Sequence, residues 1–432
     1  MTTFDETLPI IAEILKRHKA DLSDMDWLLV NRDLKGKIRL IAPVEVSESK
    51  LAPTLEEIAK ELESRLGDRA YPAEYAILYD ENREDACKGA SLFPLEGFDN
   101  IEVADRLPVS GNWLSFARED SGAPLVVFFS VKGGVGRSTA IAASALSLAQ
   151  KGKKVLVLDM DLASPGLSSA LLPENRRPEY GIVDWLIEDL VGNGNFILDR
   201  MYAKSDIIRD EEVFVVPAHG REPGEYVSKL GRAWMPVVRD DGATESWPQR
   251  LRRMVDELKK ALDPEIVLID SRSGIDDLAS ACVTDLGARL ILLFAFDDEQ
   301  TWTGCQILFR HWRHASVARK IRERLQLVAA MMPETDTLER LEEMREAGYE
   351  LFAAEMYDAI PPGEMIEERW NFEESDEFAP HSPWLIRRHQ GFTSLKTLRG
   401  RLSKIEESTV AHVFGPLIQG LGELIEERDS DG

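Results

Sequence analysis

The sequence has few cysteines, and no two of them lie close together along the chain. Its 432 residues include only Cys87, Cys282 and Cys305, which lie far apart and form no Cys-x-x-Cys motif. Disulfide frameworks, zinc sites and iron–sulfur scaffolds need clustered cysteines. The spacing therefore argues against any of these being built from this chain alone.

Positive charge and long apolar runs are also scarce. The 52 Lys and Arg residues against 77 Asp and Glu residues leave a formal net charge of −25. No apolar run approaches the about 18 residues that a membrane-spanning helix needs, and the N-terminus lacks the basic-then-apolar layout of a secretory signal. With 44% hydrophobic and 30% charged residues, the composition predicts a soluble, acidic, cytoplasmic protein of two or three domains.

The first part of the chain, 1–120, is expected to form a small α+β domain. Two apolar runs, 27–30 and 38–41, flank Lys35-Gly36 and predict a β-hairpin. The runs 75–79 and 101–103 are further strand candidates. No catalytic motif occurs there, so we expect a partner or sensor domain, with a structural cap as the alternative.

After the polar stretch 118–124 the pattern changes. Short unbroken apolar runs occur at 125–129, 155–158, 213–216, 266–269, 290–294 and 327–330. Such runs, separated by helical stretches, are typical of strands that are buried on both faces. Residues 124–432 are therefore predicted to be an α/β domain, a mostly parallel sheet with helices on both faces. A C-terminal helical extension from about 363 is expected to pack on this sheet.

A glycine-rich segment joins the first of these strands to a helix. Residues 129–139 read FSVKGGVGRST, with three glycines in four positions. Such a backbone can wrap closely around an anion, and the positive end of the following helix adds to the attraction. Ser138 has the position of a magnesium ligand and Thr139 is placed to donate to a phosphate oxygen. The segment predicts a nucleotide-phosphate loop.

Acidic residues end two of the predicted strands. Asp159 and Asp161 follow the run 155–158, and Asp270 follows 266–269. Ligands of open α/β sheets lie beyond the carboxyl ends of the strands. We therefore expect all three carboxylates near the phosphate loop, where Mg²⁺ and an attacking water must be held.

Together these motifs resemble those of the MinD/ParA-like P-loop ATPases. KGGVGRS at 132–138 resembles their deviant Walker A motif, Asp159-Met160-Asp161 their second acidic motif, and 270–274 their Walker B and switch region. The resemblance covers about 124–362. The loop is most similar to that of the KGGVGR-motif subgroup, in which arginine replaces the usual phosphate-loop lysine.

The resemblance implies ATP and Mg²⁺ as ligands and a role for each loop residue. Lys132 would be the signature lysine that reaches across an ATP-sandwiched homodimer to the partner's phosphates. Ser138 would bind Mg²⁺ and Thr139 the α-phosphate. The residues expected to surround the phosphates are Gly133, Gly134, Val135, Gly136, Arg137, Ser138 and Thr139.

The resemblance also implies roles for the acids. Asp161 would position the attacking water, Asp159 would support the metal region, and Asp270 would hold Mg²⁺ through water. Arg137, expected at the catalytic centre, keeps a positive charge but replaces a compact ammonium by a planar fork. We therefore expect a slow ATPase, used as a molecular switch that dimerises around ATP·Mg²⁺ and regulates a protein partner through the N-terminal domain.

Alternative functions remain open at this point. One is a noncatalytic nucleotide-binding scaffold, in which Arg137 marks lost hydrolysis; another is a ParA-like DNA-partitioning ATPase. DNA binding is not favoured, and membrane binding is not expected because the apolar stripe of the C-terminal tail runs into acidic residues. The KGGVGR loop and the extra N-terminal domain also suggest a bacterial signalling or anti-phage defence assembly. The pattern identifies no adenine-contacting residue.

The DNA-binding alternative depends on two basic segments. The first, 310–324, contains Arg310, Arg313, Arg319, Lys320, Arg322 and Arg324. The second, 387–404, contains Arg387, Arg388, Lys396, Arg399, Arg401 and Lys404.

Overall fold

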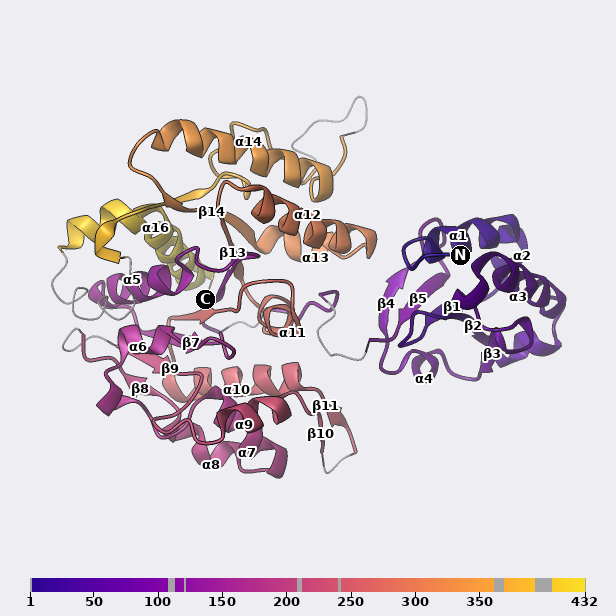
Figure 1. Cartoon of the computed structure of the whole chain (residues 1–432), viewed down its shortest axis with the longest axis horizontal. Helices are drawn as coiled ribbons and strands as arrows, with labels where there is room; N and C mark the ends of the chain where they lie inside the picture. The colour runs from indigo at the N-terminus through magenta and orange to yellow at the C-terminus, as the bar shows by residue number, and fades with distance from the viewer. Residues whose placement is uncertain are drawn as a thin grey trace. The chain divides into compact units, whose positions relative to one another are not determined.

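The computed structural model describes residues 2–107, 113–119, 122–207, 212–239, 242–360, 369–392 and 406–431, without the side chains of 428–431. The chain forms two compact units, Met1–Leu114 and Ser115–Gly432 (Figure 1). The sequence placed the boundary near residue 120. Residues just before that point already belong to the second unit, since the Ala117 N–H donates to the Thr284 carbonyl over 2.8 Å.

The first unit is built on a five-stranded mixed sheet with the order β3-β2-β1-β5-β4. Its strands are β1 (Leu28–Arg32), β2 (Ile38–Pro43), β3 (Ile77–Asp80), β4 (Ser91–Pro94) and β5 (Ile101–Asp105). The predicted hairpin is confirmed, because β1 and β2 pair antiparallel with Leu29 opposite Ile41. The other two predicted strands are also present, as β3 and β5. The short strand β4 was not predicted.

Helices cover both faces of this sheet. Helices α1 (Thr7–Arg17), α2 (Lys19–Leu22) and α3 (Ala52–Leu66) share the larger core with the strands on one face. On the other face a small cluster of Leu29, Ile41, Ala86 and Ala104 brings in α4 (Arg83–Cys87). The predicted α+β class of this unit is confirmed.

The second unit is built on an eight-stranded sheet with the order β15-β14-β13-β6-β12-β7-β9-β8. Its strands are β6 (Leu125–Phe129), β7 (Val155–Asp159), β8 (Ala203–Lys204), β9 (Val213–Val216), β12 (Ile266–Asp270), β13 (Leu290–Ala295), β14 (Leu325–Met332) and β15 (Trp384–Arg387). All neighbours pair in parallel except β8 and β9. The six predicted strands and the mostly parallel sheet are confirmed, and the edge strands β8 and β15 are additional.

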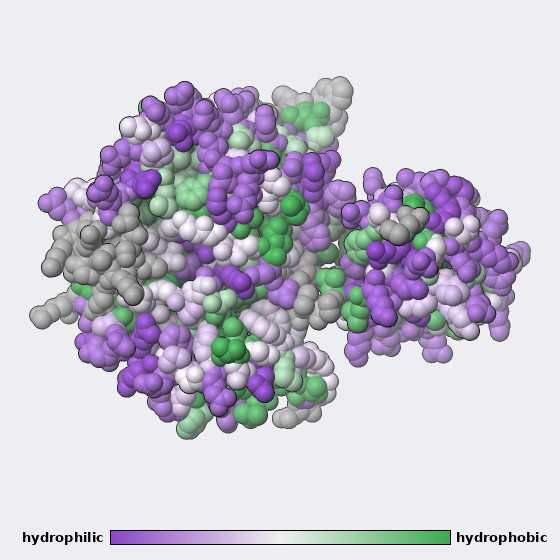
Figure 2. Space-filling view, viewed as in Figure 1, coloured by the Kyte–Doolittle hydropathy of each residue, from purple (hydrophilic) through white to green (hydrophobic). Residues whose placement is uncertain are grey.

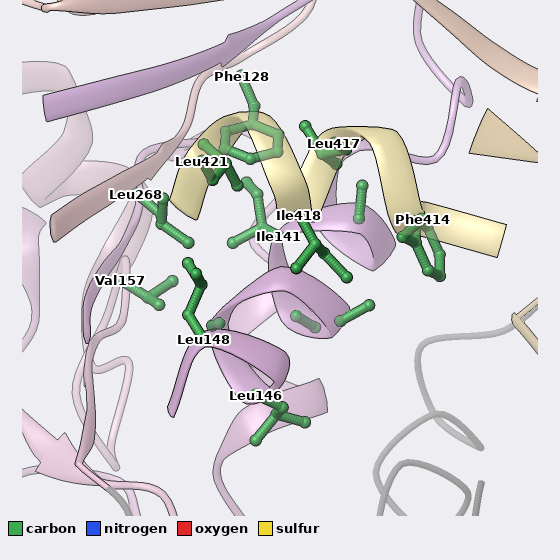
Figure 3. Packing of buried hydrophobic residues seen from close by; sticks show 14 of the residues in the cluster. Phe128, Ile141, Leu146, Leu148, Val157, Leu268, Phe414, Leu417, Ile418 and Leu421 are labelled. Carbon is green, nitrogen blue, oxygen red and sulfur yellow. The ribbon is translucent and has the colours of Figure 1, made fainter. Parts of the chain in front are cut away.

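One face of the large sheet is covered by α5 (Arg137–Gln150), α6 (Leu167–Leu171) and α16 (Glu407–Asp431). Figure 3 shows strand residues such as Phe128 and Leu268 gathered with Ile141 of α5 and Leu421 of α16. Of the C-terminal extension predicted from about 363, residues 363–368 and 393–405 lie outside the described part of the chain.

The opposite face carries α12 (Glu299–His314) and α14 (Thr337–Glu355). Gly348 of α14 lies so close to Leu327 of β14 that an added Cβ would meet its side chain at 2.8 Å. Phe309 of α12 packs edge-on against Phe352 of α14, with centroids 5.2 Å apart. The remaining elements are α7 (Ile182–Glu188), α8 (Gly194–Ile197), α9 (Tyr226–Ala233), β10 (Val237–Val238), β11 (Thr244–Glu245), α10 (Trp247–Leu262), α11 (Asp277–Ser280) and α13 (Ala318–Ile321).

The acidic tail helix packs on the protein core. Val413, Leu417 and Leu421, which form its apolar stripe, are at most 1% exposed. Hydrophilic residues cover most of the visible surface of each unit (Figure 2). Among the described residues, no helix is both long enough and apolar enough to cross a membrane.

Replacing Leu421 by Ala should lower the free energy of unfolding by about 2–4 kcal/mol, because it leaves a cavity among α5, α16 and the sheet. Chemical denaturation monitored by circular dichroism would measure the loss. Gln419→Ala, on the exposed side of the same helix, serves as the control and should change stability by less than about 0.5 kcal/mol. Equal effects of the two substitutions would contradict the packing of α16.

Candidate functional site

The glycine-rich segment forms a tight loop between β6 and α5. Gly134 and Gly136 have φ values of +78° and +84°, in the left-handed region that favours glycine. An added Cβ on Gly136 would lie 3.4 Å from the side chain of Met331. The Gly274 N–H donates to the Ser130 carbonyl over 2.9 Å, which ties the loop to the segment that follows β12.

Arg137 is buried beneath this loop. Its Nη1 donates to Ser130 Oγ, and its Nε lies 3.7 Å from Asp270 Oδ1. Its side chain is only 8% exposed. The guanidinium of Arg137 is therefore held in place by Ser130 and Asp270.

Ser138 and Asp270 meet at the start of α5. Ser138 Oγ donates to Asp270 Oδ2 over 2.5 Å. A serine hydroxyl next to a carboxylate offers the oxygen donors that Mg²⁺ prefers. Asp270 Oδ1 has no hydrogen-bond partner within the described residues, so these two residues fit the partial shell of a Mg²⁺ that is completed by phosphate and water.

Asp159 and Asp270 end neighbouring strands and face each other in register. Asp159 is fully buried, and its Oδ2 accepts from the Ser168 N–H over 3.2 Å. Burial raises the pKa of Asp159 to about 7 and that of Asp270 to about 6, with the Asp270 charge adding to the shift of Asp159. Arg137 and the Ser138 hydroxyl oppose the shift at Asp270.

Asp161 lies in a more open position than the other two acids. Partial burial raises its pKa, while Arg137, the Ser164 N–H and Arg272 lower it. It lines the same cavity as the phosphate loop. Within the described residues no three His, Cys, Asp or Glu side chains form a metal cluster, so a metal here would depend on ligands beyond the carboxylates.

Lys132 points to the start of α12. Its Nζ lies 2.7 Å from Asp298 Oδ2, and the two side chains are 36% and 30% exposed. Asp298 also caps α12 by accepting from the Thr301 N–H over 2.8 Å. The predicted signature lysine is thus held by the carboxylate of Asp298. The positive charge of Lys132 in turn lowers the pKa of Asp298.

A cavity of about 450 Å³ joins these residues to a part of the chain that the sequence did not implicate. The part with the glycine loop, the phosphate end, is lined by Gly133, Gly134, Val135, Gly136, Arg137, Ser138, Thr139, Asp161, Ser164 and Ser273, and by Met331, which lies beside Gly136. The part with the C-terminal extension, the far end, is lined by Ile386, Arg387, Arg388, His389, Phe392 and Phe414. Of the expected site residues, Lys132, Asp159 and Asp270 do not line this cavity, although each contacts or neighbours residues that do.

The far end of the cavity was missed because it comes from the C-terminal extension. Phe392 and Phe414 pack edge-on with centroids 4.9 Å apart, and β15 places Arg387 beside them. The available signal was the run Ile386-Arg387-Arg388-His389 after a short apolar stretch. In the sequence these arginines belong to the second basic segment, 387–404, on which the unfavoured DNA-binding alternative depends.

The arginines of segment 310–324 are largely engaged with carboxylates. Arg310 and Arg313 pair with Glu355, and Arg319 and Arg322 pair with Asp358. Arg324 pairs with Glu119. In the second segment Arg387 and Arg388 line the cavity, and Lys396, Arg399, Arg401 and Lys404 lie outside the described residues.

Comparison with known proteins agrees with the resemblance of the motifs. The family model for ParA, described as "NUBPL iron-transfer P-loop NTPase", matches residues 123–186. The septum site-determining protein MinD of Escherichia coli strain K12 is 31% identical over 173 residues, which are 40% of this chain and 50% of MinD. The matched segment, 123–186, is that of a MinD/ParA-family P-loop ATPase. The chain spans about half the length of the curated relatives that it matches.

Other family members show shorter or more distant similarity. The cytosolic Fe-S cluster assembly factor NUBP2 of Bos taurus is 40% identical over 62 residues, 14% of this chain and 23% of NUBP2. The structure of the cell division ATPase MinD from Pyrococcus furiosus has 20% identity and a TM-score of 0.44, and the match covers 70% of this chain and 99% of that one. The assignment to the narrower KGGVGR subgroup stays a prediction.

Asp159→Asn should stabilise the ligand-free protein at high pH. Because the folded-state pKa of Asp159 is raised from 3.8 to about 7, the folded protein binds this proton more tightly than the unfolded chain does. Wild-type stability therefore falls as the pH rises from about 4 to about 7. The variant cannot ionise there, so its advantage should grow over that range to roughly 4 kcal/mol at pH 8.

Thermal unfolding of both proteins between pH 5 and pH 8, without nucleotide or Mg²⁺, would measure this effect. Glu346→Gln, an exposed carboxyl in the same unit, is the control and should show no pH-dependent difference. A constant difference between Asp159→Asn and wild type across that range would refute the burial argument.

Proposed function

We propose that this protein is an ATP-dependent molecular switch, which binds ATP with Mg²⁺, hydrolyses it slowly and changes its association state as it does so. The observation that carries the proposal is the contact of Ser138 with Asp270 at 2.5 Å, directly behind a glycine loop that opens α5. A glycine-rich loop, a serine hydroxyl and a strand-end carboxylate thereby lie together. That combination suits a nucleoside triphosphate bound with Mg²⁺.

The proposed reaction is transfer of the terminal phosphoryl group to water. The water oxygen forms a bond to the γ-phosphorus while the bond to the β–γ bridging oxygen breaks, and ADP leaves with that electron pair. The attacking water loses a proton, which passes to the phosphate product or to solvent. Asp161, half-buried on the cavity wall, would orient the water and accept its hydrogen bond. Ser138 and Asp270 would hold Mg²⁺, whose role is to neutralise charge on the phosphates. Catalysis would depend on positioning and charge stabilisation.

Arg137 supports binding more than rapid turnover. It already donates to Ser130 Oγ and faces Asp270. A guanidinium held in this way supplies a fixed positive charge below the loop, but it cannot follow a moving phosphate without leaving a buried carboxylate unpaired. Slow hydrolysis is the expected consequence.

The far end of the cavity would take the base and the sugar. Phe392 and Phe414 supply apolar surface, and Arg387 and Arg388 supply donors. Nucleotide pockets combine apolar walls with a few convergent polar groups. The C-terminal extension would thus complete the nucleotide site.

Association with a second copy of the chain would depend on Lys132. Its ion pair with Asp298 is about one-third exposed on both sides, and such pairs contribute little net stability. A triphosphate on a second molecule could therefore displace Asp298 at small cost. The resulting homodimer would enclose nucleotide between the two copies.

The N-terminal unit would then engage a protein partner. It has its own core and its own mixed sheet, and its sequence carries no catalytic motif. We therefore assign it partner recognition, with a structural cap as the alternative. A bacterial signalling or anti-phage defence assembly is the setting that the KGGVGR-type loop favours.

DNA partitioning receives less support. Five of the arginines in 310–324 have carboxylate partners, which reduces the free positive charge that phosphate contacts need. Arg387 and Arg388 serve the cavity instead. Salt-sensitive, ATP-dependent binding of DNA would restore this alternative.

Lys132→Ala should abolish ATP-dependent association. We expect the wild-type mass, measured by light scattering, to double with ATP·Mg²⁺ and to stay monomeric with ADP·Mg²⁺ or without nucleotide. The variant should stay monomeric in all three conditions, whereas Lys260→Ala, an exposed lysine on α10, should behave as wild type. A wild-type mass that is the same with and without nucleotide would contradict the proposed switch and favour a constitutive scaffold.

Asp161→Ala should slow ATP hydrolysis by roughly 100-fold while leaving ATP binding nearly unchanged, because the water loses its acceptor. Phosphate release and equilibrium binding of a fluorescent ATP analogue would separate the two effects. Glu346→Ala, on the surface of α14, is the control. Wild-type turnover no faster than that of Asp161→Ala would identify the protein as a noncatalytic nucleotide-binding scaffold.

A further inference from the structure

An arginine occupies the loop that follows β12, beside the phosphate loop. Residues 270–274 read Asp-Ser-Arg-Ser-Gly. Ser273 Oγ lies 3.3 Å from the position of a Cβ on Gly133, and Gly274 donates to the carbonyl of Ser130. Arg272 is therefore fixed at its backbone next to the site where phosphates are expected.

The side chain of Arg272 is held by a weak ion pair. Its Nε lies 3.2 Å from Asp276 Oδ2, and the two side chains are 44% and 33% exposed. Asp276 also caps α11 by accepting from the Ala279 N–H over 2.9 Å. An exposed pair of this kind is worth little net free energy, so a more highly charged anion can displace the carboxylate.

Arg272 is the neighbour of Ser273, which lines the same cavity as Asp161, the proposed water-positioning acid. Asp161 lines the phosphate end of the cavity. The backbone of Arg272 is thus one residue from the wall of the cavity in which the terminal phosphate of a bound triphosphate is proposed to lie.

We propose that Arg272 is a phosphate-contacting residue of this site, which leaves Asp276 and donates to the terminal phosphoryl oxygens of a bound nucleoside triphosphate. This inference rests on the proposed nucleotide function. Arg137 already donates to Ser130 and pairs with Asp270, so it cannot move to the terminal phosphate. Arg272, a second guanidinium near the phosphate loop, would supply the positive charge there. Negative charge gathers on the terminal oxygens as the bond to the leaving ADP breaks, and a planar guanidinium can donate to two of them at once.

The test compares affinities of the full-length protein for ADP·Mg²⁺ alone and for ADP·Mg²⁺ with aluminium fluoride, which imitates the phosphoryl group in transfer. We expect the fluoride complex to bind more tightly in wild type. Arg272→Ala should reduce this preference by about 10-fold or more and leave the affinity for ADP alone within about 2-fold of wild type. Arg272→Lys should restore part of the preference.

The matched control is Arg289→Ala. Arg289 is also an exposed arginine, paired with Glu119 at 3.1 Å, and its N–H donates to the Leu125 carbonyl, at the opposite end of β6 from the phosphate loop. It should keep the wild-type preference.

Asp276→Asn tests the holding role of the ion pair. Asparagine preserves the cap on α11 and removes the negative charge that competes for Arg272. The preference for the fluoride complex should rise several-fold, and this rise should vanish when Arg272→Ala is also present. A structural role of Asp276 alone would not show that dependence.

Two outcomes separate the proposals. If wild type binds ADP and the fluoride complex with the expected preference, and folded Arg272→Ala keeps that preference, Arg272 does not contact the phosphoryl group and the nucleotide function stands. If wild type binds neither species, both the nucleotide function and the role of Arg272 are overturned. Equal unfolding temperatures of wild type and Arg272→Ala establish that the variant is folded.

Discussion

The candidate site depends on how the negative charge of one buried carboxylate, that of Asp270, is balanced by its neighbours. Asp270 ends β12, between β6 and β7 in the middle of the sheet, and is 1% exposed. A buried charge is stable only when it is paired and hydrogen-bonded. Arg137 and Ser138, the first two residues of α5, provide that compensation. The glycine loop is thereby fixed to the sheet, because the residues that end it are the partners of Asp270.

The other cations at this edge are held in a similar way, but more loosely. Lys132 faces Asp298 and Arg272 faces Asp276, and these two lysine and arginine side chains are 36% and 44% exposed, against 8% for Arg137. Screening by water weakens the exposed pairs far more than the buried one. The arrangement therefore combines one fixed charge at the centre with two that can move to an incoming anion. Such a gradation suits a protein whose state depends on whether a terminal phosphate is present.

The sequence predicted the glycine-rich loop and the strand-end carboxylates that lie together at this edge of the sheet, but not the part of the cavity wall that comes from the C-terminal extension. The loop at 132–139, the acids at 159, 161 and 270, and six strands are local features, written in glycines, unbroken apolar runs and strand-end carboxylates. Strand β15 is only four residues long and follows Pro383, so it has no comparable local pattern. The pairing of Arg310 with Glu355 and of Arg322 with Asp358 joins residues more than 30 positions apart, and nothing in the spacing of the cations predicts which acids fold against them.

The C-terminal extension is where the core and the site are joined. On α16, Phe414 lines the cavity, whereas Leu417 and Leu421 are fully buried in the core shared with α5. Helix α5 in turn begins at the phosphate loop. A displacement of α16 would therefore change both the packing of α5 and the wall opposite the phosphates. The family model matches residues 123–186, and the part of the cavity wall that comes from 386–392 and from Phe414 of α16 lies outside that segment. The shape of the cavity therefore depends on the C-terminal extension as well as on the motifs of the phosphate loop.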